Sequence, residues 1–401
     1  MKIRIYNIGS IVTWSHKNNE VQSLTNVEIL IDGDKISDIS HKILDADQEI
    51  YAEGALIIPG FIDSHTHPIF IGNRSNEFAL RVEGKTYDEI ARSGGGILAS
   101  INKVRNASEE QLIEESYGKI NLFLSHGTTT IEAKSGYGLT LKDEVKSLRV
   151  IKKLNENGKL EIIPTFLGAH AVPPEFQNNH KKYVDLICDK MIPEVADRKL
   201  AIFCDVFCEE GYFSVKQSEK ILLKGIDCGL IPRLHADEFI DSGAAGLAAD
   251  IKAVSADHLM FASDDNLKKM ADANVISVVL PGTTFFLGKN EYVNAEKILK
   301  FGGDIAIASD YNPGSCLVQS MPFIMFLSNL YCNLSIDLSF KACTYNAAKV
   351  LKKETEIGLV KEGFKADLLI WKADKIANIP YCFDNADSSI LNIIKNGTIL
   401  K

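Results

Sequence analysis

The 401-residue sequence has no run that approaches the ~20 consecutive apolar residues of a membrane-spanning helix. It also has no excess of positive charge, because 44 Lys and Arg stand against 53 Asp and Glu, for a formal net charge of −9. Affinity for nucleic acids depends largely on clustered Lys and Arg. The composition therefore predicts a protein that binds neither membranes nor nucleic acids and whose partner is a small molecule.

The eight cysteines lack the even, short spacing of a disulfide framework. With 46% hydrophobic residues, a chain of this length can bury a large core without disulfides. Cys204 and Cys208 are the one close pair, but the apolar run Ala201–Phe207 predicts a buried strand there rather than a metal clip. Residues Met1–Tyr6 alternate polar and apolar side chains, which predicts a strand rather than a signal peptide. These features favour a reducing compartment, and we expect a cytoplasmic protein.

Both ends of the chain have the patterns of β-strands. Short alternating segments fill the first sixty residues, with a hairpin signal at Asp32-Gly33, and a strand at Ala366–Trp371 and a turn at Asn396-Gly397 follow near the other end. Because a single hairpin is only marginally stable, we expect the two ends to pack together. The sequence predicts one small β-sandwich domain formed by both chain termini, residues 1–54 and 349–401.

Residues 55–348 show apolar runs of strand length that alternate with helical periodicity, as is typical of βα units and a parallel sheet. Eight strands are predicted, at Ala55–Asp63, Thr128–Ala133, Glu161–Leu167, Ala201–Phe207, Leu230–Leu234, Ala253–Ala256, Val275–Leu280 and Asp304–Ala308. This number predicts an α/β fold with a (β/α)8 TIM barrel. A doubly wound sheet is the alternative, but no strand precedes a G-x-G-x-x-G turn. The run Gly94-Gly95-Gly96 instead predicts a flexible loop.

Histidines gather at the carboxyl ends of these predicted strands, where barrel enzymes place their chemistry. Five of the nine histidines lie there, namely His65, His67, His170, His235 and His258. His65 and His67 are two residues apart, so both imidazoles project from one side of an extended strand. Together with His235 and Asp310 they offer ligands suited to zinc or iron. The sequence therefore predicts one Zn²⁺ or Fe²⁺/Fe³⁺ ion per chain.

A bound divalent ion lowers the pKa of its water from about 15.7 toward roughly 7, which predicts hydrolytic chemistry. Asp310 is expected to ligate through one oxygen and to carry a proton from the water to a leaving nitrogen. Glu238, three residues after His235, is expected to move protons or to hold a ring nitrogen of the substrate. His258 is expected to stabilise negative charge on the carbonyl oxygen. Asp310, His258 and Glu238 are thus the predicted catalytic residues.

The segment Pro59-Gly-Phe-Ile-Asp-Ser-His65-Thr-His67, followed by His235, His258 and Asp310, resembles the amidohydrolase superfamily in its mononuclear-metal form. Lys134 ends the second predicted strand, not the fourth, where a bridging carbamylated lysine would stand. Within the superfamily the sequence is similar to the imidazolonepropionase family over essentially its whole length. Seven strings carry the similarity, Phe70–Arg74, Lys134–Leu139, Phe166–Pro174, Arg233–Glu238, Val254–His258, Leu280–Phe285 and Asp310–Ser315.

This resemblance implies hydrolysis of the cyclic amide of 4-imidazolone-5-propanoate to N-formimidoyl-L-glutamate, a step of L-histidine degradation, by a homodimer. It implies that His65, His67, His235 and Asp310 bind the metal. It also implies contacts to substrate or product from Arg74, Tyr137, His170, Glu238, Asn312, Gly314 and Ser315.

The residues themselves agree with an anionic substrate. The planar guanidinium of Arg74, seven residues after His67, suits a carboxylate, and Tyr137 would donate a further hydrogen bond. A ring deaminase of the same superfamily is the alternative, although neutral bases offer no carboxylate to Arg74. A non-catalytic barrel is a second alternative, and the intact set of ligands argues against it.

Overall fold

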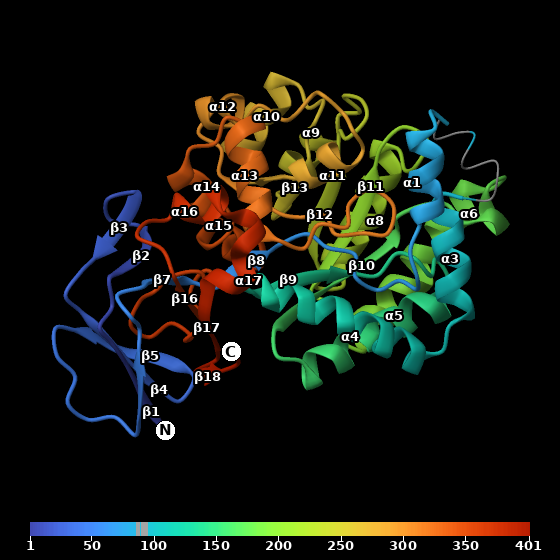
Figure 1. The fold of residues 1–401 in the computed structure, drawn as a ribbon. Helices are drawn as coiled ribbons and strands as arrows, with labels where there is room; N and C mark the ends of the chain where they lie inside the picture. Colours follow the sequence, from blue (N-terminus) through green and yellow to red (C-terminus); the bar gives the residue numbers. More distant parts are fainter. Residues whose placement is uncertain (86–88, 90–94) are drawn as a thin grey trace.

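The computed structural model describes residues 1–85, 89 and 95–401. Its described residues form an eight-stranded parallel sheet, a six-stranded sheet and a four-stranded sheet (Figure 1). The strands of the eight-stranded sheet follow one another in chain order and pair in parallel throughout. They are β8 (Phe61–Asp63), β9 (Thr128–Lys134), β10 (Glu161–Ala169), β11 (Phe203–Cys208), β12 (Ile231–Ala236), β13 (Ser255–His258), β14 (Ile276–Val279) and β15 (Ile305–Ile307).

The segments that follow β8 and β15 close this sheet into a barrel. The backbone N–H of Asp310 donates to the carbonyl of His65 at 3.0 Å, and that of His67 donates to the carbonyl of Tyr311 at 2.8 Å. The predicted (β/α)8 barrel is therefore confirmed. Because closure runs through His65, His67 and Asp310, the backbone that seals the barrel also places three of the predicted metal ligands side by side.

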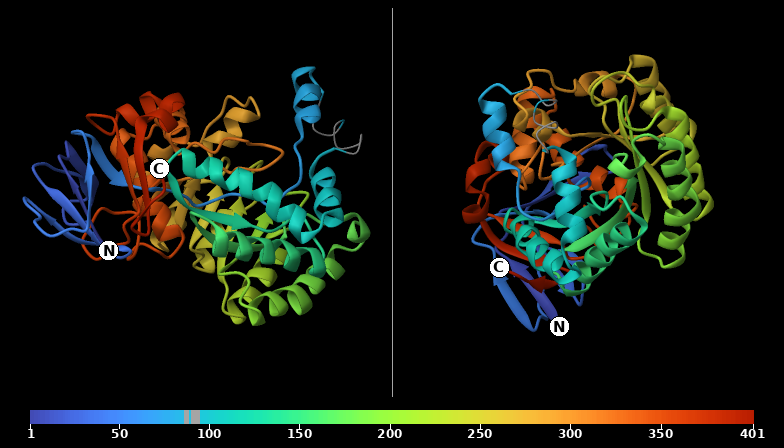
Figure 2. Two further views of the ribbon diagram at one scale, coloured as in Figure 1. Left: turned by 60° about the horizontal axis from the view of Figure 1, so that its bottom comes forward. Right: turned by 90° about the vertical axis from the view of Figure 1, so that its right-hand side faces the viewer.

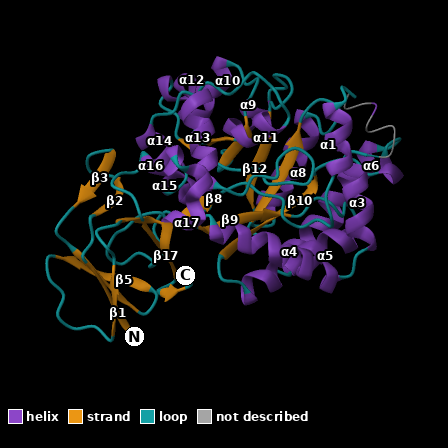
Figure 3. Ribbon diagram, viewed as in Figure 1, coloured by secondary structure: helices purple, strands orange, loops and turns teal. Residues whose placement is uncertain are grey.

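Helices follow the strands and cover the outside of the barrel (Figure 3). The described α-helices are α1 (Ser75–Val82), α3 (Ile97–Asn106), α4 (Glu109–Ser125), α5 (Leu141–Asn157), α6 (His180–Leu186), α7 (Ile192–Asp197), α8 (Val215–Asp227), α9 (Ala244–Asp250), α10 (Asp264–Asp272), α11 (Pro281–Phe286), α12 (Ala295–Lys300), α13 (Met321–Tyr331), α14 (Ile336–Ala342), α15 (Tyr345–Val350), α16 (Asn378–Tyr381) and α17 (Ala386–Ser389). Ser108 and Gln111 form a capping box at the start of α4. No helix of the described residues is long and apolar enough to cross a membrane.

The two ends of the chain form the other two sheets and pack together, as predicted, and the six-stranded sheet contains strands from both ends. The four-stranded sheet consists of β1 (Lys2–Tyr6), β4 (Glu28–Asp32), β5 (Lys35–Ser40) and β6 (Gln48–Tyr51). The six-stranded sheet joins β2 (Ser10–Ser15), β3 (Glu20–Leu24) and β7 (Leu56–Pro59) to β16 (Leu368–Trp371), β17 (Ile390–Lys395) and β18 (Thr398–Ile399). Buried isoleucines of both ends form one core, and both termini lie close to these sheets, on the side of the molecule away from α1 (Figures 1 and 2).

Three details differ from the sequence prediction or lie outside the structure. The predicted strand Ala55–Asp63 is two strands, because β7 pairs with β16 while β8 opens the barrel. The hairpin turn consists of Gly33 and Asp34, one residue later than expected, since Asp32 pairs with Lys35. Gly94 lies outside the described residues, and Gly96 caps α3. The domain limits at 54/55 and 348/349 stay a prediction.

Candidate active site

The four predicted metal ligands converge at the carboxyl end of the barrel. The Nε2 atom of His67 lies 3.3 Å from Nε2 of His65 and 3.4 Å from Nε2 of His235. The Oδ1 atom of Asp310 lies 3.5 Å from Nε2 of His65 and 3.4 Å from Nε2 of His67. Ligand atoms at about 2.0–2.1 Å around a tetrahedral ion are about 3.3–3.4 Å apart. The four separations given above are close to this value, and the ligand atoms of His65, His67 and Asp310 all lie within 4.8 Å of one another, so this cluster could hold a metal ion.

Two buried carboxylates orient two of these imidazoles. Asp257 Oδ2 lies 2.6 Å from Nδ1 of His65, and Asp205 Oδ2 lies 3.1 Å from Nδ1 of His235. A carboxylate at Nδ1 keeps the proton on that nitrogen and leaves the Nε2 lone pair for a metal. Among the described residues, Nδ1 of His67 has no such partner. Sequence analysis missed both aspartates, and the available signal was a lone acidic residue within each buried strand.

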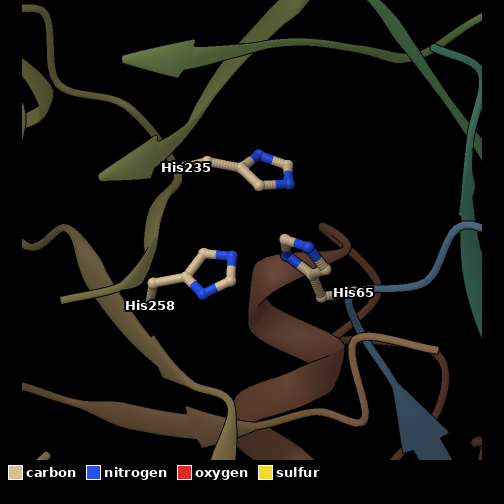
Figure 4. A group of neighbouring side chains, drawn as sticks. All are labelled: His65, His235 and His258. Atoms are coloured by element: carbon tan, nitrogen blue, oxygen red, sulfur yellow. The ribbon is translucent and has the colours of Figure 1, made fainter. Parts of the chain in front are cut away.

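His258 and Glu238 lie beside the ligands. His258 is close enough to His65 and His235 for the three rings to form a possible metal-binding group (Figure 4). Its Nε2 atom is 3.7 Å from Oε2 of Glu238. Burial lowers the pKa of His258 well below its usual range, whereas burial and the charge of Asp310 raise the pKa of Glu238 to about 8. Near neutral pH these shifts favour a neutral imidazole next to a protonated carboxyl group.

Asp310 has a different partner at each carboxylate oxygen. Its Oδ1 atom faces His65 and His67, while Oδ2 accepts a hydrogen bond from the hydroxyl of Thr283 at 2.6 Å. Burial alone would raise the pKa of Asp310, but the hydrogen bonds to the two histidines hold it well below its usual range. Thr283 belongs to α11 and to the Leu280–Phe285 string, yet sequence analysis assigned it no role.

Asp310 and His258 share an unusual backbone conformation. The φ angles are 52° at Asp310 and 77° at His258, both in the left-handed region that non-glycine residues rarely occupy. Such conformations persist where surrounding structure enforces them, and they cluster at functional sites. His258 ends β13 and Asp310 follows β15, and each lies in a possible metal-binding group with His65.

One cavity of about 560 Å³ opens over the ligands and brings the predicted substrate-contact residues together. Its lining includes all seven of these residues, Arg74, Tyr137, His170, Glu238, Asn312, Gly314 and Ser315. The rings of His67 and His170 stack at 5.1 Å with an interplanar angle of 21°. The lining also includes residues that sequence analysis missed, namely Glu77, Arg81, Phe207, Tyr212, Phe239 and Lys289.

Arg74 is held in the cavity wall by Glu77 and packs closely over Gly314. Its Nε and Nη2 atoms donate to the two carboxylate oxygens of Glu77 at 2.8 and 2.5 Å. A Cβ atom on Gly314 would lie only 2.2 Å from Nη1 of Arg74. The guanidinium of Arg74 can lie this close to the backbone because residue 314 is a glycine and has no side chain.

Asn312 uses its side chain within its own loop. Its Oδ1 atom accepts the N–H groups of Gly314 and Ser315, each at 2.8 Å. Its Nδ2 atom donates to the carbonyl of Asp310 at 2.7 Å and to the hydroxyl of Ser315 at 2.8 Å. Asn312 therefore shapes the loop that carries Gly314 and Ser315.

The fold is that of a barrel hydrolase of the amidohydrolase type, with a His and Asp cluster that could hold a metal ion. A family model described as "Amidohydrolase family" matches residues 215–400. The triazine hydrolase from Arthobacter aurescens is similar in structure, with a TM-score of 0.75 and 16% identity over 100% of this chain and 94% of that chain. A Xaa-Pro dipeptidase gives a TM-score of 0.73 at 14% identity, over 100% of both chains. At these identities the structures show the fold alone.

Curated relatives narrow the class. The imidazolonepropionase of Alkaliphilus oremlandii is 40% identical over 394 residues, which is 96% of this chain and 93% of that protein. The one of Brevibacillus brevis is 46% identical over 353 residues, 88% and 82% of the two chains. The one of Geobacillus thermodenitrificans is 42% identical over 393 residues, 96% and 92%. The chain belongs to the imidazolonepropionase family.

Proposed function

We propose that this protein hydrolyses the cyclic amide of 4-imidazolone-5-propanoate to N-formimidoyl-L-glutamate, a step of L-histidine degradation. The observation that carries the proposal is the close approach of the ligand atoms of His65, His67, His235 and Asp310, with four of their separations at 3.3–3.5 Å, beside a cavity whose wall presents Arg74. The curated relatives with the name imidazolonepropionase support the substrate. We further propose that the enzyme is a homodimer and acts in the cytoplasm.

His65, His67, His235 and Asp310 are the proposed ligands of one Zn²⁺ or Fe²⁺/Fe³⁺ ion. Imidazole nitrogens with one carboxylate oxygen suit either metal. When bound, the ion supplies Lewis acidity and lowers the pKa of water at the site. The buried aspartates at Nδ1 of His65 and His235 support this assignment, because metal-bound histidines usually donate their second N–H to such a group.

Asp310 is the proposed proton carrier. It takes a proton as water adds to the ring carbonyl and delivers it to the ring nitrogen as the C–N bond breaks. Thr283 holds Oδ2 of the carboxylate, so the group stays in one orientation through both transfers. His258 faces the developing oxyanion, and Glu238, which lies 3.7 Å from His258, holds a ring nitrogen of the substrate by a hydrogen bond.

Arg74 is the proposed partner of the propanoate carboxylate, with Tyr137 and His170 beside it. The rings of Tyr137 and His170 are 5.3 Å apart, and both rings lie next to His67. Glu77 already occupies two donors of Arg74, so the substrate must share the guanidinium with Glu77 or displace it. Asn312 holds Gly314 and Ser315, which complete the same wall of the cavity.

A side-by-side assay tests the proposal. The purified protein is incubated with 4-imidazolone-5-propanoate, whose ring absorbance should disappear, and with a panel of amino-substituted purines and pyrimidines, which should release no ammonia. Asp310→Asn is the control and should be inactive in both assays while remaining folded. Ammonia release without loss of imidazolone would establish the ring deaminase instead. Light scattering of the eluted protein tests the dimer.

A further inference from the structure

The interior layer beneath the proposed metal ligands is ionic. Five charged side chains on the barrel strands β9, β11, β12 and β13 are fully buried there, Glu132, Lys134, Asp205, Arg233 and Asp257. The interior of such a barrel is usually filled by branched apolar side chains. Buried charges are costly unless they are paired and hydrogen-bonded. Their presence in this layer therefore calls for a specific role.

These five side chains form one connected network. Lys134 Nζ donates to Oε1 of Glu132 at 2.7 Å and to Oδ2 of Asp205 at 2.8 Å. Arg233 Nη2 donates to Oδ2 of Asp257 at 2.8 Å, and its Nη1 atom lies 3.4 Å from Oε1 of Glu132. Glu132 thus joins the lysine to the arginine, and each cation holds one of the aspartates.

The network contacts the ligands from below at several points. Asp205 and Asp257 face Nδ1 of His235 and His65. Glu132 Oε2 accepts the backbone N–H of Thr66, the residue between His65 and His67, at 3.0 Å. On the other side of His65, Arg233 Nη2 donates to the carbonyl of Ser64 at 2.8 Å. The network therefore forms hydrogen bonds with the backbone on both sides of His65 and contacts the imidazoles of His65 and His235.

Three carboxylates face two cations in this layer, so each cation is needed to hold like charges together. Without Lys134, the carboxylates of Glu132 and Asp205 would lose their shared donor. Without Arg233, Asp257 and the carbonyl of Ser64 would lose theirs. The substrate cavity does not include Lys134 or Arg233 in its lining, as far as the described residues show.

We propose that Lys134 and Arg233 are positioning residues for the metal ligands. They hold Asp257 and Asp205 at the Nδ1 atoms of His65 and His235, and Glu132 couples the two halves into one support. The inference rests on the proposed metal site. It gives a role to Lys134 and Arg233, the first residues of two of the seven strings, for which the resemblance implied none. Neither side chain is proposed to contact the ion or the substrate, yet loss of either one should weaken metal binding.

The test compares Lys134→Met and Arg233→Met with Lys395→Met. Lys395 forms a buried ion pair with Asp367 at 2.6 Å in the terminal sheet. Its Nζ atom also lies 3.4 Å from Oγ1 of Thr130 and 3.5 Å from Oε2 of Glu161, in the amino-terminal part of β9 and β10, whereas the ligands lie at the carboxyl end of the barrel. Co²⁺ affinity is measured by competition with a chelator, and the visible absorption of the Co²⁺ protein is recorded. We expect the dissociation constant to rise about 10–100-fold in the two network variants, with an altered spectrum. Lys395→Met should keep the wild-type affinity and spectrum even where it lowers the melting temperature.

Glu132→Gln is the milder variant if a methionine variant does not fold. It keeps an acceptor for the N–H of Thr66 but removes the charge that joins Lys134 to Arg233, and we expect a rise of about 3–10-fold in the dissociation constant. Wild-type affinity and spectrum in the folded variants would overturn the inference alone. A wild-type protein that binds no ion would overturn the proposed metal site together with the inference.

Discussion

Replacing Gly314 with alanine should move the guanidinium of Arg74 without unfolding the protein. The new Cβ would lie 2.2 Å from Nη1 and 2.9 Å from Cζ of Arg74. Heavy atoms in contact prefer separations of about 3.5 Å, so the guanidinium must retreat by roughly 1 Å. The obstructed group is the far end of a flexible side chain. We therefore expect the free energy of unfolding to change by less than about 0.5 kcal/mol.

The kinetic effect should be much larger than the effect on stability. A displacement of about 1 Å in a positioning group can cost up to ~100-fold in catalytic efficiency. A hydrogen bond to a charged group is worth about 1.5–3 kcal/mol, and each 1.4 kcal/mol corresponds to about tenfold. Because Arg74 is proposed to bind the non-reacting carboxylate, the loss should appear in KM. We expect a KM about 10–100-fold higher, with kcat within about threefold of wild type.

Initial rates of Gly314→Ala, Arg74→Ala and the double variant test this mechanism. If the methyl group acts only through Arg74, the double variant should be no worse than Arg74→Ala. Gly118→Ala is the matched control, because a Cβ there meets nothing within 4 Å. An unchanged KM in Gly314→Ala, or additive losses in the double variant, would refute the reasoning.

Three further predictions concern Thr283, Glu161 and the metal. Thr283→Val removes the 2.6 Å hydrogen bond to Asp310 and should lower kcat by about 10–100-fold, whereas Thr283→Ser should restore it with equal metal content; a fully active valine variant would contradict the role of Thr283. Burial favours a raised pKa for Glu161, but the charges of Lys395, Lys365 and Lys353 hold its pKa below the usual 4.5. The ionised carboxylate therefore stabilises the fold above about pH 4.5, and this stabilisation is lost as the pH falls through the lowered pKa. In urea unfolding, Glu161→Gln should cost roughly 2 kcal/mol at pH 7 and progressively less below about pH 4.5; a cost independent of pH would exclude this ion-pair contribution. Dialysis against a chelator should abolish activity, and Zn²⁺ or Fe²⁺ should restore it; full activity of metal-free protein would contradict the proposed site.

The barrel strands could be predicted because they are buried on both faces and alternate with helical patterns. The division of Ala55–Asp63 into β7 and β8 could not. Burial is the same on both sides of the division, for Leu56, Ile57 and Ile58 in the six-stranded sheet and for Phe61 and Ile62 in the barrel. The hydrophobic pattern therefore does not show where the chain passes from one sheet to the other. Only Pro59-Gly60 hints at the crossing, where a Cβ on Gly60 would lie 2.3 Å from Thr129.

The ligands and their supports differ in how far sequence reasoning reaches. His65 and His67 could be predicted from their spacing, and His235 and Asp310 from their places at the ends of predicted strands. The partner of His65 is Asp257, 192 residues away in the sequence, and only the closed barrel brings the two together. Glu77 illustrates the same limit at short range, because a helix position three residues after Arg74 could equally face solvent.

The formal charge of −9 describes the whole chain and not the field inside the cavity. The lining has three cationic side chains, Arg74, Arg81 and Lys289, and three acidic ones, Glu77, Glu238 and Asp310. Burial and the charge of Asp310 raise the pKa of Glu238 to about 8, which favours its neutral form near pH 7. A bound divalent ion would be the largest local charge, and together with the three cationic side chains it would make the lining positive. A positive electrostatic potential inside a cleft raises the local concentration of anions. The cavity can therefore attract a carboxylate substrate although the chain as a whole is acidic.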